Sequence, residues 1–172
     1  PLDKEAVGEQ VYMDMLYHAK EYVHIMTPYL ILSQEMSNAL THAARCGKEV
    51  IIIMPGIPDK PYAFLLAKTY YPELLKAGVK IYEYTPGFVH AKVFVADGIQ
   101  AAVGTINLDF RSLYLHFECA AYMHSVAAVA DIEKDFQDTL SKCHCVTMED
   151  CRKLPLWKKA AGRCLRIVAP LM

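Results

Sequence analysis

The sequence predicts an α/β protein, an α/β/α sandwich in which a mixed β-sheet is flanked by helices. Helix and strand patterns alternate up to about residue 84, which is typical of parallel strands joined by helices. The segment EVIIIMP at 49–55 is apolar on both faces, as in a strand of a sheet that is covered on both sides. A hairpin pattern at 89–105 then adds antiparallel strands, so the sheet is expected to be mixed.

Local signals place the first elements in order. Residues 3–21 are expected to be helical because apolar residues recur at every fourth position. Residues 22–30 are expected to form a short apolar strand that ends at Pro28. A second helix begins at the N-cap Ser33 and stops at Gly47.

The later elements follow from the same kinds of signal. The segment 60–78 is expected to be a helix that is interrupted near Pro72, and the sequence TMED caps the start of the last helix. The remaining elements are a strand at 79–84, hairpin strands at 89–96 and 99–105, a strand at 116–124, a helix at 126–143 and a helix near 148–166.

Composition limits the possible classes of function. Hydrophobic residues make up 54% and charged residues 22% of the 172 residues, which excludes disorder. The net charge is −1, so nucleic acid is not an expected partner. No apolar run is long enough to span a bilayer. We expect one domain over 1–172, soluble by itself, and a fragment of a longer two-motif protein because the chain begins at Pro1.

The six cysteines do not predict disulfides or a metal site. Their spacing is irregular and the chain is large enough to fold without disulfides, so reduced thiols are expected. Cys143, His144, Cys145 and Cys151 lack the paired spacing of zinc ligands. Neither a metal nor a cofactor is predicted.

The polar residues of the hairpin gather at one place in the predicted register. With Asp97-Gly98 as a two-residue turn, His90 faces Thr105 across the hairpin. His90, Lys92, Thr105 and Asn107 then share one face at the end away from the turn, because side chains alternate along a strand. Asp97 lies at the turn with the other parity, which predicts a structural role.

These side chains fit attack on a phosphodiester. A neutral imidazole avoids repulsion by the phosphate and forms a covalent phosphohistidine, while an ammonium and an amide bind the non-bridging oxygens. The ring needs an acceptor for its other nitrogen, and Glu118 is the first candidate, followed by Asp109 and the acids of 131–138. The alternative is a satisfied core histidine beside a lysine with a buried stem, but four converging polar groups favour catalysis.

The stretch HAKVFVADGIQAAVGTIN at 90–107 resembles the phospholipase D signature, His-x-Lys, four residues, Asp, six residues and Gly-Ser/Thr-x-Asn. Every position is met, and Thr105 stands where many members have serine. Flanking segments such as HIMTPYLILSQEM, ELLKAGVKIYEYTPGFVH and IVAPLM are similar to the second catalytic half of a bacterial cardiolipin synthase. The resemblance implies a membrane-associated phosphatidyltransferase that joins two phosphatidylglycerol molecules into cardiolipin and releases glycerol.

The resemblance also implies roles for individual residues. Its catalytic group is His90, Lys92, Asp97 and Glu118, and its phosphate-binding group is Lys92, Thr105 and Asn107. Within it His90 is the nucleophile or its acid/base partner, and Glu118 orients the His90 ring through a hydrogen bond. Asp97 belongs to the signature, but its position at the turn still predicts a structural role.

The family uses two such motifs, and this chain has one. No other histidine has a lysine two residues on, so the second motif comes from an upstream half or from a second copy of the chain. The chain alone is expected to be weak or inactive, and the whole protein to act on membrane lipids at the cytoplasmic face of a bacterial cell membrane. Two alternatives remain: a homodimeric phosphodiesterase or nuclease, which the neutral charge disfavours, and a non-catalytic scaffold, which the complete motif disfavours.

Three further features each allow two interpretations. Tyr29 either lines a substrate channel or packs in a turn. Arg111 with Ser112 either binds a second phosphate or is solvated. The last helix combines Trp157 and several basic residues with apolar ones, so it either lies on an anionic bilayer or docks on the protein by its apolar face.

Overall fold

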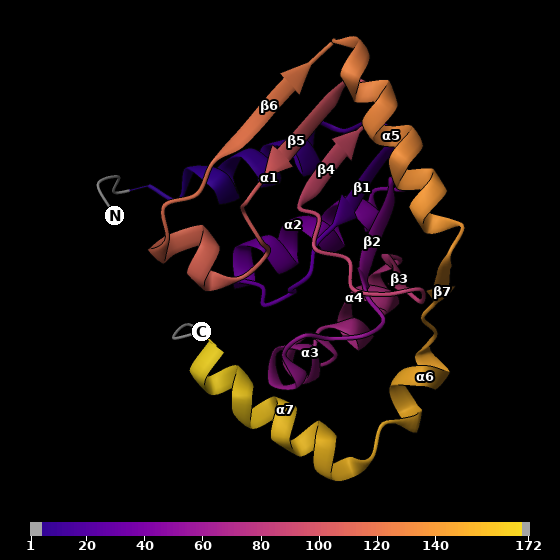
Figure 1. The fold of residues 1–172 in the computed structure, drawn as a ribbon. Coiled ribbons are helices and arrows are strands. Elements are labelled where there is room, and N and C mark those ends of the chain that lie inside the picture. Colours follow the sequence, from indigo (N-terminus) through magenta and orange to yellow (C-terminus); the bar gives the residue numbers. More distant parts are fainter. Residues whose placement is uncertain (1–4, 170–172) are drawn as a thin grey trace.

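The computed structural model describes residues 5–169, and its centre is a mixed sheet of seven strands with helices on both faces (Figure 1). The strand order is β6-β5-β4-β1-β2-β3-β7. β1 pairs with β2 and β2 with β3 in parallel, and the other four pairs are antiparallel. The predicted α/β/α sandwich with a mixed sheet is confirmed.

Most expected elements are present with shifted bounds. The elements in chain order are α1 (Val7–His18), β1 (Tyr22–Met26), α2 (Gln34–Arg45), β2 (Glu49–Pro55), α3 (Pro61–Ala67), α4 (Tyr71–Ala77), β3 (Lys80–Tyr84), β4 (Val93–Ala96), β5 (Gln100–Gly104), the π-helix η1 (Arg111–Leu115), β6 (Ala120–His124), α5 (Ala127–Leu140), β7 (Cys143–Cys145), α6 (Met148–Lys153) and α7 (Leu156–Val168). No helix of the described part is both long and apolar enough to cross a bilayer.

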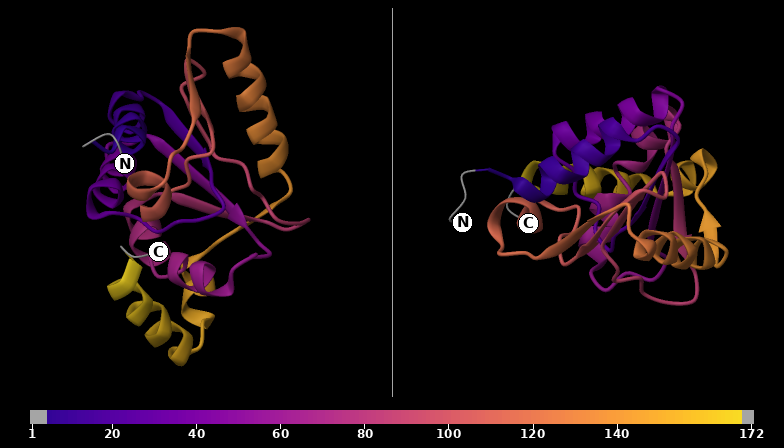
Figure 2. Two further views of the ribbon diagram at one scale, coloured as in Figure 1. Left: turned by 60° about the vertical axis from the view of Figure 1, so that its left-hand side comes forward. Right: turned by 90° about the horizontal axis from the view of Figure 1, so that it is seen from above.

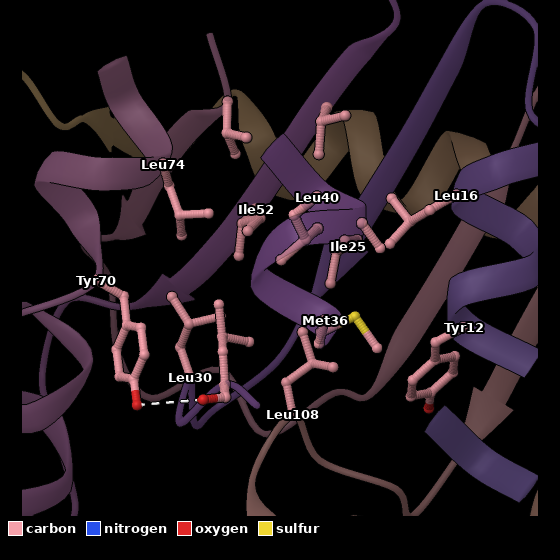
Figure 3. Packing of buried hydrophobic residues seen from close by; sticks show 14 of the residues in the cluster. Tyr12, Leu16, Ile25, Leu30, Met36, Leu40, Ile52, Tyr70, Leu74 and Leu108 are labelled. Atoms are coloured by element: carbon pink, nitrogen blue, oxygen red, sulfur yellow. Dashed lines mark hydrogen bonds between the residues drawn. The ribbon is translucent and has the colours of Figure 1, made fainter. Parts of the chain in front are cut away.

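Apolar side chains pack helices against both faces of the sheet. One face packs against α1, α2 and α4, and α5 covers the other, as the view from above in Figure 2 shows. Ile25 and Ile52 pack on the first face with Leu40 of α2 (Figure 3). The alternate strand residues Met26, Ile51, Ile53 and Val93 pack with Phe136 of α5. Burial on both faces explains why β2 is apolar throughout.

The structure confirms the residues that were predicted to begin and end these helices. The hydroxyl of Ser33 accepts a hydrogen bond from the Met36 N–H at 3.0 Å, as an N-cap does. Gly47 and Gly78 end α2 and α4 with φ of 87° and 102°, values that side-chain-bearing residues adopt rarely. The break between α3 and α4 falls just before Pro72, as predicted.

Three local features differ from the prediction. The last helix is two helices, because Pro155 has no N–H to continue α6, which begins with a capping box between Thr147 and Asp150. Cys143–Cys145 forms the edge strand β7 against β3, which the short polar sequence did not reveal. The π-helix η1 was not predicted either.

The predicted hairpin register is wrong by one residue. Val93, and not Lys92, pairs with Val103. The connection holds the three residues 97–99, of which the first two have φ of 54° and 64°. His90 and Lys92 therefore precede β4, where the alternation of a strand no longer decides which way a side chain points.

Candidate active site

The candidate site lies where β1, β2, β3 and β5 end and β4 begins. His90 and Lys92 lie in the segment that enters β4, and residues 105–109 leave β5 at the same end. Leu108 joins this segment to the one after β1, because its carbonyl accepts the Ile31 N–H at 2.7 Å. Loops after parallel strands are the usual place for ligands in open α/β sheets.

His90 and Lys92 are in direct contact. The ammonium Nζ of Lys92 lies 3.0 Å from Nδ1 and 3.1 Å from Nε2 of the His90 ring, and it donates to the His90 carbonyl at 2.6 Å. Lys92 is buried, with 8% of its surface exposed, whereas His90 is exposed. A lysine only donates and a neutral imidazole has one unprotonated nitrogen, so only one of these two ring nitrogens can accept a hydrogen bond from Lys92.

The charges around this pair favour a neutral imidazole. Burial and then the Lys92 cation lower the pKa of His90 below its ordinary value. Burial also lowers the pKa of Lys92, while the carboxylates of Glu118, Asp109 and Asp59 oppose that shift. The three acids thus stabilise the Lys92 cation, and the cation in turn disfavours protonation of His90.

Glu118 does not bind His90, so the predicted hydrogen bond between them is wrong. The Thr105 hydroxyl donates to Glu118 Oε2, and the Cys119 N–H donates to the Thr105 hydroxyl at 3.0 Å. The other Glu118 oxygen lies 3.8 Å from Nδ1 of His116. The reason is that β6 begins only at Ala120, so Glu118 lies in the preceding loop beside the end of β5.

Asp97 directly follows β4, and His90 lies in the segment before β4, so the strand separates the two residues. Its carboxylate accepts hydrogen bonds from three successive backbone N–H groups, those of Lys20, Glu21 and Tyr22, at 2.6, 2.9 and 2.8 Å. Partial burial alone would raise the pKa of Asp97, but these donors lower it overall. Asp97 thus contacts the connection between α1 and β1, at the end of β4 away from His90.

Asn107 retains a free donor. Its amide Nδ2 donates to the Ser112 hydroxyl at 2.8 Å, which leaves a second N–H on the same nitrogen. Its Oδ1 is buried and has no hydrogen-bond partner among the described residues. Ser112 belongs to η1 and is itself held by Asp109, and Arg111 of the same helix donates to His116 at 2.8 Å.

Three residues near His90 were not singled out for the site from the sequence. Asp59 and Lys60, from the connection between β2 and α3, respectively raise and lower the pKa of His90. The Phe88 ring lies 5.6 Å from the His90 ring, between centroids. Tyr29 joins them, since its hydroxyl donates to Asp59 at 2.5 Å and Lys60 lies 5.0 Å from its ring centroid. The available signal was the pair of charged residues four and five positions after the end of the buried strand EVIIIMP.

Comparison with known proteins agrees with this arrangement. The family model described as "Cardiolipin synthase, PLD-like domain" matches residues 12–140. The chain belongs to this family. A cardiolipin synthase of Geobacillus kaustophilus is 36% identical over 172 residues, which are 100% of this chain and 34% of that protein. An uncharacterized protein of Streptococcus mutans is 59% identical over 172 residues, 100% of this chain and 37% of that protein.

This PLD-like chain spans about a third of the length of these curated relatives. Solved structures share the PLD-like fold. The phosphatidylserine synthase of Haemophilus influenzae matches with a TM-score of 0.71 at 18% identity, over 94% of this chain and 42% of that one. Nuc of Salmonella typhimurium, a phospholipase D family member, matches with a TM-score of 0.69 at 17% identity, over 80% of this chain and 89% of that one. At these identities the likeness shows the fold alone.

Proposed function

We propose that this chain is one catalytic half of a phospholipase D-type phosphatidyltransferase, which makes cardiolipin from two phosphatidylglycerol molecules and releases glycerol. The contact between the Lys92 ammonium and the His90 ring is the observation that carries the proposal, because it keeps a nucleophilic imidazole beside a cation that binds phosphate. Relatives named cardiolipin synthase support the substrate class.

The proposed reaction has two steps and uses two motif histidines. One histidine attacks the phosphorus of phosphatidylglycerol, the bond from phosphorus to the glycerol oxygen breaks, and the leaving oxygen takes a proton from the second histidine. A primary hydroxyl of the second phosphatidylglycerol then attacks the phosphohistidine, gives its proton to the second histidine, and the phosphorus–nitrogen bond breaks. A neutral His90 fits the nucleophile of the first step, because the histidine that protonates the leaving oxygen has to begin as the cation.

The other residues are proposed to hold and position. Lys92 and the free N–H of Asn107 bind the non-bridging oxygens, and they stabilise the charge that develops there. Glu118 is a positioning residue in this proposal, because it holds the Thr105 hydroxyl and its charge supports the Lys92 cation. We propose that Asp97 acts through the fold.

The second motif is proposed to come from an upstream half of the same protein at the cytoplasmic face of a bacterial membrane. The second candidate is a phosphodiesterase of two identical chains; the match with Nuc, a phospholipase D family member, covers 89% of the Nuc chain. The net charge of −1 disfavours nucleic acid as its substrate, since backbone phosphates bind to basic surfaces.

The test is a comparison of products. The chain alone, over a range of concentrations, and the chain joined to an upstream domain with a second His-x-Lys motif are incubated with phosphatidylglycerol vesicles and, separately, with single-stranded DNA. We expect cardiolipin and glycerol only from the joined protein, and none after His90→Asn. DNA cleavage that rises with concentration of the chain alone would favour the second candidate. Turnover by a strictly monomeric chain would contradict both.

A second measurement assigns the histidine roles. Quenched reactions are examined by mass spectrometry for a phosphatidyl group on a histidine. An adduct on His90 makes it the nucleophile, and an adduct only on the partner motif makes His90 the acid/base. No adduct in either half would contradict the covalent route.

A further inference from the structure

Helix α7 turns its apolar face away from the protein. Gly162 is buried against α3 so closely that a Cβ there would lie 2.6 Å from Cγ2 of Thr69 and 3.2 Å from the Leu65 carbonyl oxygen. Four large apolar side chains instead lie within about 60° of the direction opposite Gly162, at 100° per residue. They are Leu156, Trp157, Ile167 and Val168, with exposed fractions of 82%, 67%, 81% and 41%; we call them the outward face.

An amphipathic helix on a soluble domain normally does the reverse, and buries its apolar stripe. Here the polar side of α7 faces the protein. A groove of about 410 Å³ lies beside the contact between α7 and α3, and its lining is mostly basic, with Glu73 at 3.9 Å from Arg166. Arg45, Lys68 and Lys76 come from one wall, and Lys158, Lys159 and Arg166 from α7. Arg166 also lies 4.0 Å from the Tyr70 ring centroid, which helps to fix this orientation.

The charge of this region differs from that of the remaining chain. Residues 151–169 hold six basic and no acidic side chains, whereas the other residues, with 12 basic and 19 acidic ones, carry −7. Arg152, Lys158 and Arg163 are exposed and form no ion pair with an acidic side chain of the described residues. The Lys158 ammonium lies 5.5 Å from the Trp157 ring centroid, so a cation stands directly beside the apolar face.

We propose that the outward face of α7 lies on the surface of an anionic lipid bilayer. The apolar side chains would enter the boundary between headgroups and acyl chains, and the neighbouring lysines and arginines would meet lipid phosphates. Trp157 at the edge of the face fits the interface, where tryptophan is favoured. An uncharged or zwitterionic partner would leave the exposed Arg152, Lys158 and Arg163 without complementary charge.

The position of α7 brings the bilayer to the end of the molecule that carries the site. α7 packs on α3, and the connection that precedes α3 holds Asp59 and Lys60 beside His90. In Figure 1, α7 crosses the molecule beyond α3, at the end toward which β1 and β2 run. A lipid headgroup would therefore approach His90 from the surface on which the protein rests. This inference concerns binding and does not depend on the proposed transfer reaction.

Trp157 is the single tryptophan of the sequence, so its fluorescence reports on α7 alone. The 172-residue chain is mixed with vesicles of phosphatidylglycerol and phosphatidylcholine, or of phosphatidylcholine alone. We expect a blue shift of the emission and co-sedimentation with the first vesicles only, and partial release by salt. The double variant Leu156→Ser/Ile167→Ser should bind at least about tenfold more weakly, since each side chain buries apolar surface.

Two further variants make the test specific. Val126→Ser removes a matched apolar residue, 49% exposed, from the connection between β6 and α5, and should bind like the wild type. Arg152→Glu/Lys158→Glu/Arg163→Glu leaves the apolar face intact and should lose the preference for phosphatidylglycerol. Thermal unfolding checks that each variant folds.

The outcomes that overturn the proposal are distinct. One is the absence of a blue shift and of co-sedimentation, and another is equal binding by the double variant and the Val126→Ser control. A blue-shifted emission without vesicles, in a dimer that Leu156→Ser/Ile167→Ser converts to monomers, would assign the outward face to a second copy. Binding is read without turnover, so vesicle binding by the 172-residue chain together with a joined protein that makes no cardiolipin would contradict the proposed function and leave this inference standing.

Discussion

Lys92 places its ammonium 3.0 and 3.1 Å from the two ring nitrogens of His90, and it binds the carbonyl of the same residue at 2.6 Å. A single side chain thus contacts the ring and, after burial, is the next cause of its lowered pKa. The lysine is buried and the histidine is exposed, so the fold holds the cation in place while the ring remains open to substrate.

Replacing Lys92 by methionine should raise the pKa of His90, because the cation is one cause of its lowered value. Protonation of the ring then sets in at higher pH, and the acid limb of the pH profile of activity moves up with it. The rate in the joined protein should fall by about 10²–10³, as for loss of an electrostatic stabiliser. NMR titration of the ring Cε1–H checks the pKa, with the other histidines as internal reference. An unchanged titration would show that Lys92 does not set the charge of His90.

Asp97→Asn should act on stability rather than on chemistry. The amide loses one of the two accepting oxygens, and its N–H₂ group meets a backbone donor, which costs about 1 kcal/mol after discounting for exposure. Because the folded pKa of Asp97 is lowered, the carboxylate stabilises above the unfolded pKa of about 3.9, and this contribution is lost as pH falls through the folded value. The difference between the urea unfolding free energies of the two proteins should therefore close below about pH 4. Lost activity with unchanged stability would make Asp97 catalytic after all.

Glu118→Gln should lower the pKa of Lys92 and leave the tautomer of His90 unchanged. The Glu118 carboxylate is the first of the charges that raise the Lys92 pKa, and it makes no hydrogen bond to His90. Lysine Nζ titration and the ¹⁵N shifts of the His90 ring separate the two effects. A changed ring spectrum in Glu118→Gln would restore the orienting role that the sequence suggested.

Gly162→Val should destabilise the packing of α7 on α3 by about 1–3 kcal/mol, since the new side chain meets Thr69 and the Leu65 carbonyl. Ala160→Val adds similar bulk at an exposed position of the same helix and should be close to neutral. Chemical denaturation of both variants measures the difference. Equal stabilities would mean that α7 does not pack tightly at Gly162.

The elements of the fold were predictable where local chemistry decides them. Ser33 caps α2, Gly47 and Gly78 end helices, and EVIIIMP is a covered strand, because each signal acts within a few residues. The strand β7 was not predictable, because Cys143–Cys145 has no alternation of apolar and polar residues. It is a strand because it pairs with the edge of β3. The division between α6 and α7 could have been predicted from the sequence, because Pro155 interrupts the helix.

The candidate site was predictable as a motif and less so as a geometry. The signature correctly predicted that His90 and Lys92 lie close together. The register was less predictable, because an Asp-Gly pair fits a three-residue connection as well as a two-residue turn. One extra residue in the connection shifts every pair between β4 and β5 by one residue. The partner of Glu118 depends on where β6 starts, which no local pattern fixed. Asp59 and Tyr29 meet through the parallel order of β1 and β2, a contact between residues 30 positions apart.

The four residues between Lys92 and Asp97 are Val93–Ala96, which are the whole of β4. Asp97 fixes one end of this strand to the start of β1, and His90 with Lys92 emerges at the other end. The spacing between Lys92 and Asp97 in the motif therefore corresponds to the length of β4. One residue more or fewer in β4 would move the segment that holds His90 by about 3.3 Å relative to Asp97. A sequence search for His-x-Lys, four residues and Asp therefore selects chains in which this strand has a fixed length.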